Sequence, residues 1–357
     1  MLLMSGKTSR LVAVMAEHFY VTALALCLLL SSACSEDKAA SPLLTLDGLT
    51  MGTTYSVKIN ESKLPFSAEL INANLNDILI DINQKMSTYI EDSELSLINQ
   101  NNSGDWLVLS GDLYYVLNEA STVSAITLGK FDITVGPLVN MWGFGPFAQT
   151  ETIPSDADIN DALAEVGFDK ISLRFENPAI KKLNPALYID LSGIAKGYAV
   201  DLMADYLEQI GIANYMVEIG GEIRAKGVNQ KKTNWRIGIE KPLTDKRSVQ
   251  RIIKLDNIAM ATSGDYRNYF EKDGVRYSHT IDPVTGRPIT HNLVSVTVLH
   301  ESATRADALA TGFLVMGKEL AYDLAMKNEL AVLFIERSDS TFTESYTTSL
   351  HPYLVEQ

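Results

Sequence analysis

The sequence of 357 residues predicts an α+β fold with mixed or antiparallel sheets and packed helices. Segments with strand-like alternation and segments with helical spacing are interspersed along the chain, without a steady βαβ rhythm. No low-complexity segment, internal repeat or obvious linker interrupts the region after residue 43. We therefore expect one large domain over residues 44–357.

Apolar spacing predicts the individual elements. The fold is expected to begin near Leu44, a strand is expected at residues 53–59, and Ile71, Leu75, Ile78 and Ile82 then recur at helical spacing up to Met86. Further helices are predicted at 113–128, 155–167, 194–210, 302–316 and 319–327. Extended segments are predicted at 170–175, 187–190, 215–219, 235–240, 252–255, 293–299 and 330–335.

The first 33 residues have the pattern of an export signal. Lys7 and Arg10 precede an apolar run over residues 19–30, which is too short for a comfortable membrane span of about 20 residues. We expect residues 1–33 to be a cleaved signal peptide and residues 34–43 to be a short polar tether. A start of translation at Met4 or Met15 is an alternative.

Small residues lead to Cys34, and this segment resembles a bacterial lipoprotein signal. In such signals the cysteine becomes the acylated first residue of the mature protein, and leucine usually stands three positions before it. Here Ser31 has that position, and Leu30 lies one position further away. The resemblance implies lipidation of Cys34, palmitate included, and a location on the periplasmic side of the inner membrane. The alternative is an ordinary cleaved signal in which Cys34 is incidental.

Charge and cysteine content exclude some functions. The formal net charge is −14, and loss of residues 1–33 would remove two basic residues and one acidic residue, leaving −15. Such a chain repels polyanions on average, so a nucleic-acid partner is not expected. Both cysteines, Cys27 and Cys34, lie in the leader, so the mature domain has no thiol for a disulfide, a thiolate ligand or a nucleophile.

The segment from Asp190 to Asp201 (DLSGIAKGYAVD) predicts an anion site. An apolar extended stretch ends at Asp190, and Ser192 and Gly193 lead directly into a predicted helix. The N-terminus of a helix attracts anions through its free N–H groups and its dipole. The alternative is that Asp190 or Ser192 is a plain helix N-cap.

The segment from Ala306 to Gly312 (ADALATG) predicts a cation site. Asp307 and Thr311 stand four residues apart, which places a carboxylate and a hydroxyl on one face of a helix. Hard oxygen ligands suit Mg²⁺ or Ca²⁺, and the lack of cysteine and of clustered histidine disfavours zinc. The same pair is also common on solvated helices.

The segment from Ser278 to Pro288 (SHTIDPVTGRP) predicts a general base. His279 precedes a tight turn over Asp282-Pro-Val-Thr-Gly286, and a histidine there can accept a proton near neutral pH. A lone histidine is more often structural. Taken together, the three segments indicate an enzyme that acts on a phosphoryl group.

Glycine-bearing stretches at 131–145 and 218–222 allow close approach of backbone to a ligand, and Trp142 and Phe144 could form the wall for an aromatic ring. Turns and core packing are the alternative. Neither a G-x-x-x-x-G-K-[ST] nor a G-x-G-x-x-G stretch occurs, so the usual nucleotide-binding folds are not indicated.

Considered together, nine ordered segments resemble the ApbE family, the FAD:protein FMN transferases. They cover nearly all of residues 44–336 and comprise 51–55, 86–89, 131–145, 190–201, 218–222, 238–242, 261–266, 278–288 and 306–312. The resemblance implies an ApbE-like, T-fold-related domain. It also implies an exported, Mg²⁺-dependent enzyme that cleaves FAD and attaches FMN through a phosphoester to a threonine of an electron-transfer protein, with release of AMP.

The resemblance also implies residue roles. Gly193 through its carbonyl, Asp307 and Thr311 match the metal site, and His279 matches the position that we assign as base. FAD-contacting positions are matched by Met51, Tyr89, Lys130, Phe131, Asp132, Asp190, Lys196 and Ile281. Some members have an acidic residue in place of Lys196, and some have a second carboxylate in place of Ala310.

Two other functions fit the same residues. An FAD pyrophosphatase would use water in place of threonine and release free FMN and AMP. A periplasmic flavin-binding lipoprotein would hold FAD without turnover, and Asp307, Thr311 and His279 would then have no chemical role.

Overall fold

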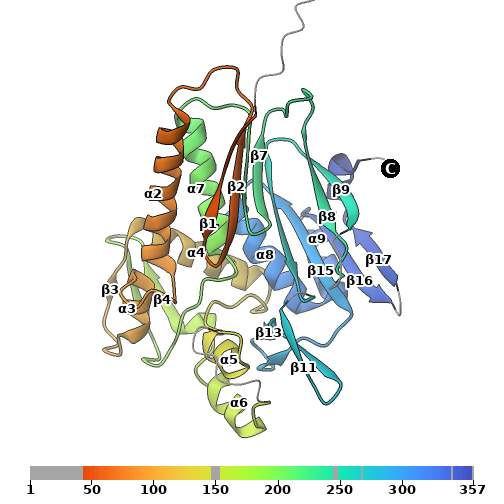
Figure 1. Ribbon diagram of the computed structural model, residues 1–357. Coiled ribbons are helices and arrows are strands. Elements are labelled where there is room, and N and C mark those ends of the chain that lie inside the picture. Colours follow the sequence, from red (N-terminus) through yellow and green to blue (C-terminus); the bar gives the residue numbers. More distant parts are fainter. Residues whose placement is uncertain (1–42, 146–152, 244–247, 267, 339–340, 356–357) are drawn as a thin grey trace, which may run out of the picture. The chain divides into compact units, whose positions relative to one another are not determined.

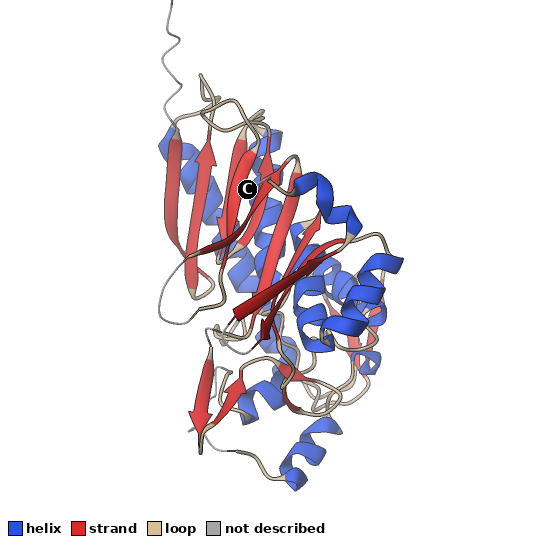
Figure 2. Ribbon diagram, turned by 90° about the vertical axis from the view of Figure 1, so that its right-hand side faces the viewer, coloured by secondary structure: helices blue, strands red, loops and turns tan. Residues whose placement is uncertain are grey.

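The computed structural model describes residues 43–145, 153–243, 248–266, 268–338 and 341–355 (Figures 1 and 2). Its centre is an eight-stranded sheet in which every neighbouring pair is antiparallel. In spatial order its strands are β1 (Leu44–Thr50), β2 (Thr53–Ile59), β6 (Tyr215–Ile219), β7 (Glu222–Lys226), β10 (Ile258–Gly264), β15 (Leu293–His300), β16 (Ala331–Ser338) and β17 (Thr341–Tyr346).

Four smaller sheets accompany it within the described residues. They comprise β3 (Leu107–Val108), β5 (Ala179–Lys182) and β4 (Ile171–Arg174); β8 (Trp235–Glu240) and β9 (Val249–Leu255); β11 (Tyr269–Lys272) and β12 (Val275–Ser278); and β13 (Ile281–Asp282) and β14 (Arg287–Pro288). The α-helices are α2 (Ala68–Met86), α3 (Glu94–Gln100), α4 (Gly111–Ile126), α5 (Gly136–Met141), α6 (Asp156–Leu163), α7 (Ala195–Gln209), α8 (Ala303–Met316) and α9 (Lys318–Lys327). Two short 3-10 helices are η1 (Phe168–Lys170) and η2 (Thr348–Tyr353).

Helices cover one face of the large sheet, as Figure 2 shows. The apolar sides of α2, α4, α7, α8 and α9 pack with the facing side chains of the sheet into the principal core. Isoleucine, leucine and valine on alternate strand positions supply the other half of that core, as expected for a sheet with one helix-covered face. Within this layer α7 packs directly on α8, and this pair carries much of the candidate site.

The opposite face of the sheet is covered in part by the β8–β9 ribbon and η2. Trp235, Ile253 and Leu255 of the ribbon pack with Met260 and Leu333 of the large sheet in a second apolar cluster. A third cluster joins α5 and α6 to the β11–β12 hairpin, and these elements gather at one end of the large sheet (Figure 1). No helix among the described residues is long and apolar enough to span a membrane.

The α+β class with antiparallel sheets is confirmed, and most predicted elements are present within a few residues of their expected bounds. The strands expected at 53–59, 215–219 and 235–240 have these bounds in the structure. The short helix expected to run to Gly167 ends at Leu163. The extended segment at 187–190 belongs to no strand: the Asn99 side chain bonds the backbone of Ile189, and the N–H of Asp190 donates to the Ile133 carbonyl, without forming a ladder.

Candidate active site

A cavity of about 460 Å³ collects most of the residues that the sequence singles out. The start of α7, the middle of α8, the end of β10 and the β13 turn contribute to its wall. The predicted site residues that line it are Tyr89, Lys130, Phe131, Asp132, Asp190, Gly193, Lys196, His279, Ile281, Asp307 and Thr311. Segments far apart in the sequence are therefore brought together, as the motifs required.

Met51 is the one predicted FAD-contacting residue that does not line this cavity. It lies at the tip of the β1–β2 hairpin with a φ of 50°, which is uncommon for a residue other than glycine. It lines an adjoining cavity of about 680 Å³ that shares Tyr89, Asp190, Ser192 and Lys196 with the first. The two cavities thus meet along α7 and Tyr89, whose side chain is 71% exposed.

A buried charge cluster lies at the wall of the first cavity. The ammonium of Lys196 lies 3.2 Å from Glu222 Oε2 and 3.7 Å from Asp307 Oδ2. The two carboxylates are almost completely buried, at 3% and 2% exposure. Burial of charge is costly unless the charges are paired, so this arrangement depends on the cation between the two acids.

The protonation behaviour of the cluster follows from the same geometry. Burial raises the pKa of Glu222, the Lys196 ammonium opposes this shift, and the charge of Asp307 adds to it. Burial also raises the pKa of Asp307, against Lys196 and the N–H of Gly197. For Lys196 itself, burial would lower the pKa, but the charges of Asp307 and Glu222 outweigh burial and raise the pKa above its ordinary value. Lys196 therefore stays cationic.

Glycines let these side chains approach one another. Gly220 and Gly221 form the two-residue β6–β7 turn with φ of 61° and 111°, and Glu222 follows at once. Gly193 lies against Thr311: a Cβ at Gly193 would be 3.3 Å from Thr311 Oγ1. The hydroxyl of Thr311 lies 3.0 Å from Ser263 Oγ of β10, so hydroxyl oxygens from α8 and β10 meet beside Gly193.

This donor set fits a hard divalent cation. Asp307, Thr311 and Gly193 offer carboxylate, hydroxyl and carbonyl oxygen, and the Lys196 ammonium shows that positive charge suits the space between Asp307 and Glu222. Within the described ranges no group of three or more His, Cys, Asp and Glu side chains could hold a metal. Three oxygen donors would leave the other positions of an octahedral Mg²⁺ shell to water or to a bound ligand.

A hydrogen bond to the backbone fixes the tautomer of His279. Its Nδ1 lies 3.0 Å from the carbonyl oxygen of Asn268, which can only accept a hydrogen bond. Nδ1 therefore carries the proton and donates, which leaves Nε2 with a free lone pair. Burial lowers the pKa of His279, and Lys196 and Arg276 act in the same direction against the Asn268 carbonyl. The imidazole is thus held in its neutral form.

Asp190 is fixed by a clamp from α3 and β5. The side-chain amide of Asn99 donates to the carbonyl of Ile189 at 2.8 Å and accepts from its N–H at 2.8 Å, as a neighbouring strand would do. Lys182, 3% exposed, donates to the carbonyls of Asn99 and Leu187 at 3.1 Å each. The Asp190 carboxylate accepts from the N–H and the hydroxyl of Ser192.

The N-cap alternative for Asp190 and Ser192 is wrong. The N-cap of α7 is Ile194, which has no side-chain capping bond. Because Asp190 folds onto Ser192, neither side chain reaches the first turn of the helix. The start of α7 faces the cavity through Gly193 and Lys196, and its dipole favours an anion there.

Two other predicted FAD-contacting residues have internal partners. Lys130 forms an ion pair with both carboxylate oxygens of Asp282, at 3.0 and 2.8 Å, and so ties the segment before α5 to β13. Asp132 accepts from the N–H and hydroxyl of Thr134 and from the N–H of Phe168. The Asp132 carboxylate therefore stabilises its own loop.

The two aromatic residues that the sequence suggests as a wall for a ligand ring lie in different environments. Phe144 lines the cavity, and its ring meets the His279 ring edge-on at 6.2 Å. Trp142 is 1% exposed, donates to the Gly286 carbonyl at 2.8 Å and stacks on Tyr277, so it is a core residue.

Sequence reasoning missed three contributors to the site. Glu222 was recognised only as part of a glycine-bearing stretch, although a carboxylate directly after a Gly-Gly turn in an apolar strand was the signal that could have identified it. Glu222 supplies a second carboxylate beside Asp307, whereas residue 310 of α8, an alanine in this chain, supplies none. Ser263 and Asn268 carried no such signal, because their roles arise only from contacts with Thr311 and His279.

Lipidation of Cys34, the signal peptide and the tether up to Pro42 lie outside the described residues, and the structure leaves them as predictions.

Comparison with known proteins gives one consistent answer. The sequence model of the ApbE family matches residues 51–334. A protein of Vibrio cholerae named FAD:protein FMN transferase is 49% identical over 87% of this chain and 92% of its own length. A protein of the same name from Haemophilus influenzae is 46% identical over 90% and 93%.

Solved structures agree with these matches. The flavin transferase ApbE of Vibrio cholerae superposes with a TM-score of 0.82 at 47% identity, covering 88% of this chain and 99% of that one. The apo form of the Pseudomonas stutzeri flavinyl transferase ApbE has a TM-score of 0.80 at 38% identity, with coverage of 88% and 97%. This chain therefore belongs to the ApbE family and is, like these relatives, a transferase.

Proposed function

We propose that this chain is a Mg²⁺-dependent FAD:protein FMN transferase that attaches FMN through a phosphoester to a threonine of an electron-transfer protein and releases AMP. The names of its relatives support the flavin and the transfer to protein. The observation that carries the chemistry is the shared cavity. It holds an oriented neutral base, His279, together with the cation-balanced acids Asp307 and Glu222.

Different residues would bind the metal, the phosphates and the rest of FAD. Asp307, Thr311 and Gly193 would hold Mg²⁺, which when bound would withdraw negative charge from the pyrophosphate of FAD. The start of α7 and the Lys196 ammonium attract the phosphates from the protein side. The remaining surface of FAD would contact residues of the two adjoining cavities, among them Met51, Tyr89 and Ile281.

The transfer step then needs one proton acceptor. Nε2 of His279 takes the proton of the threonine hydroxyl as the oxygen bonds to the phosphorus of the FMN half. The anhydride bond to the AMP half breaks, and AMP leaves with the bridging oxygen. Because Nδ1 donates to the Asn268 carbonyl, the imidazolium formed in this step is held in place.

Mass measurement of an acceptor tests the proposal. The mature chain is incubated with FAD, Mg²⁺ and a threonine-bearing acceptor, and we expect the acceptor to gain the mass of an FMN group with one AMP released per transfer. An otherwise identical acceptor with valine in place of that threonine should gain nothing. Asp307→Asn should lose transfer while the fold is kept, because the residue serves the site and the chain retains its apolar core.

The same experiment separates the other two functions. Free FMN and AMP with an unmodified acceptor would identify a pyrophosphatase, and intact FAD after long incubation with Mg²⁺ would identify a flavin-binding protein. Either outcome would overturn the proposed transfer.

We also propose that the chain is anchored by a lipid on Cys34 at the periplasmic side of the inner membrane. The export-signal pattern of residues 1–33 and the small residues before Cys34 support this location.

A further inference from the structure

Helices α7 and α8 run antiparallel and contact each other at three successive turns. Gly193, just before α7, lies against Thr311, and one turn later Gly197 lies against Asp307. A Cβ at Gly197 would be 2.3 Å from the carbonyl oxygen of Ala303 and 2.9 Å from Asp307 Cβ, so the two helices touch backbone to backbone. The N–H of Gly197 also donates to Asp307 Oδ2 at 3.1 Å. The position of Asp307 thus depends on the register between the helices.

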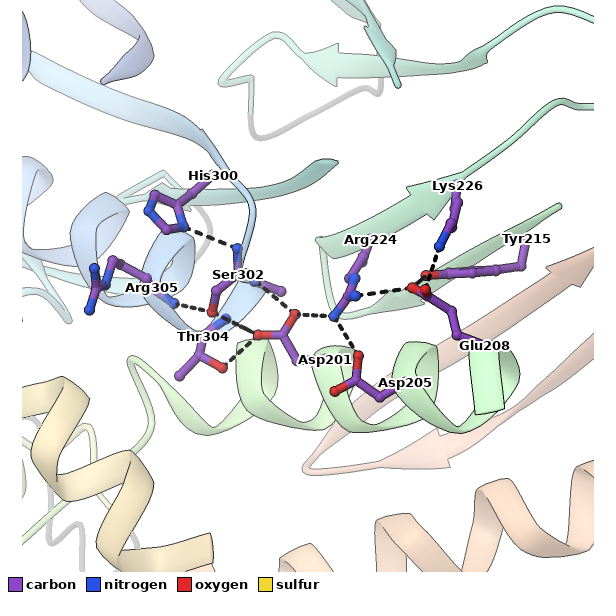
Figure 3. A network of polar contacts seen from close by, with 11 residues as sticks. Asp201, Asp205, Glu208, Tyr215, Arg224, Lys226, His300, Ser302, Thr304 and Arg305 are labelled. Carbon is purple, nitrogen blue, oxygen red and sulfur yellow. Dashed lines mark hydrogen bonds and ion pairs between the residues drawn. The ribbon is translucent and has the colours of Figure 1, made fainter. Parts of the chain in front are cut away.

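The third contact, one turn after Gly197, is made by Asp201. Its Oδ1 accepts from the N–H of Ala303 at 3.0 Å, and its Oδ2 accepts from the N–H of Thr304 at 2.9 Å (Figure 3). Oδ2 also accepts from the hydroxyls of Thr304 and Ser302, at 2.7 and 2.8 Å. A carboxylate of α7 therefore caps the first turn of α8, in addition to the N-cap Ser302.

Asp201 extends the same connection to the large sheet. Arg224 of β7 donates to Asp201 Oδ1 at 3.1 Å and also pairs with Asp205 at 2.9 Å (Figure 3). Arg224 stands two residues after Glu222, so both side chains leave β7 on the same side. Asp201 therefore connects all three elements that carry Lys196, Asp307 and Glu222.

We propose that Asp201 is a positioning residue that locks the register of α7, α8 and β7, and thereby holds Asp307 and Thr311 opposite Gly193 and Lys196. This inference rests on the proposed metal-dependent transfer. A shift of α8 by one residue would move Asp307 about 1.5 Å along the helix axis, more than a metal ligand set tolerates. Because Asp201 is 8% exposed and lines neither of the two adjoining cavities of the candidate site, it would act on that site through these contacts.

The test compares Asp201→Asn with a matched control. In the wild type, both carboxylate oxygens of Asp201 accept hydrogen bonds from donors of α8. Asparagine replaces one of these oxygens by an N–H₂ group, which cannot accept, so at least one capping bond of α8 is lost. Asp205→Asn is the control, because Asp205 lies one turn further on α7 and pairs with the same Arg224, whereas the capping bonds to α8 come from Asp201. The probe is Mn²⁺ alone, added to the mature chain and followed by electron paramagnetic resonance.

We expect Asp201→Asn to bind Mn²⁺ on the order of ten-fold more weakly than the wild type, the usual range for loss of a supporting residue behind a metal ligand. Asp205→Asn should bind as the wild type does. The amide hydrogen of Gly197 should also exchange faster in Asp201→Asn than in the wild type, because its bond to Asp307 depends on the register between α7 and α8. In Asp205→Asn its exchange rate should be that of the wild type.

Unchanged Mn²⁺ affinity together with unchanged Gly197 exchange in Asp201→Asn would overturn the inference. If the wild type binds no Mn²⁺ in the absence of FAD, Gly197 exchange alone decides whether Asp201 sets the register. Should Asp201→Asn not fold, Thr304→Val replaces it, since this change removes a single bond to Asp201 and keeps the shape of a buried side chain. Thr304→Val should then weaken Mn²⁺ binding by a smaller factor than the one expected for Asp201→Asn. An unchanged Mn²⁺ affinity in Thr304→Val would refute the inference.

Discussion

The fold influences the protonation state of His279. Burial and the cations Lys196 and Arg276 lower its pKa, while the Asn268 carbonyl opposes them. A base with a lowered pKa stays neutral to a lower pH than free histidine, whose pKa is about 6.5. The base form is therefore present through neutral pH and is lost only as the pH falls through the lowered pKa.

We predict an acid limb in the pH profile of kcat/KM that is centred below about 6.5. His279→Asn should reduce kcat by roughly 10²-fold to 10⁴-fold, the usual contribution of a general base, and should remove that limb. FAD affinity, measured by flavin fluorescence, should change little. An acid limb that persists in the variant would assign the ionisation to another group.

Lys196 shows how one ammonium stabilises two buried acids. It is partly exposed, whereas Glu222 and Asp307 are buried, so its removal leaves two neighbouring acids in a low-dielectric site without the cation that balances them. We predict that Lys196→Met lowers the free energy of unfolding at neutral pH by about 3 kcal/mol, the low end of the range for broken buried pairs. Denaturant unfolding measures this loss.

Added Mg²⁺ should recover part of the stability of Lys196→Met, because a ligand that binds only the folded state stabilises it. The exposed ion pair of Arg287 with Asp156 provides the control, and Arg287→Met should change stability by less than about 1 kcal/mol. If Lys196→Met also lowers the free energy of unfolding by less than about 1 kcal/mol, Glu222 and Asp307 are protonated and need no cation.

Among the elements, α3 has the most specific task, because its Asn99 stands in for a strand beside residues 187–190. It makes two hydrogen bonds to Ile189, and Ile189 directly precedes Asp190. We predict that Asn99→Ala destabilises the fold by about 2 kcal/mol, since two backbone groups lose their partners. We also predict a raised KM for FAD with a smaller change in kcat, because Asp190 loses its support.

Steady-state kinetics with varied FAD check this prediction. Asn101→Ala is a suitable control, since the Asn101 side chain accepts from the N–H and hydroxyl of Ser103 within its own exposed turn. Equal KM values for wild type and Asn99→Ala would show that the segment at 187–190 is held without the clamp.

The sequence predicted those elements whose periodicity is strong. Residues 235–240 alternate clearly, residues 215–219 are almost all apolar, and Ile71, Leu75 and Ile82 recur on the buried face of α2. The short helix α3 escaped prediction because it spans 7 residues, too few for a periodic pattern. β10 also escaped, because its Ala, Thr, Ser and Gly residues mimic a loop and are stabilised by the strands on either side.

The candidate site was predictable where chemistry and spacing coincide, as at Asp307 with Thr311. It was not predictable where one residue depends on a distant partner. The tautomer of His279 depends on the Asn268 carbonyl, and the ionisation of Lys196 depends on Glu222, which only the β6–β7 turn brings close. Asp201 was part of the predicted motif, yet its contacts assign it to capping α8.

At the scale of the whole molecule, the chain enters the fold far from the site. Leu44 begins β1 and pairs with Ile59, whereas Thr53, at the other end of the same hairpin, lies beside Gly220 and so next to Lys196. The 7 residues of β1 separate these two ends by about 20 Å.

The proposed lipid anchor leads to a prediction about the two cysteines. Metabolic labelling with an alkyne analogue of palmitate should mark the full-length chain, and Cys34→Ala should abolish the label and shift the protein from the membrane to the soluble fraction. Cys27→Ala is the matched control and should be labelled as the wild type is, because Cys27 lies within the apolar run of the signal. A Cys34→Ala chain that keeps both its label and its membrane association would refute the proposed anchor. FMN transfer by the purified domain should be the same with and without Cys34, since neither cysteine belongs to the described fold.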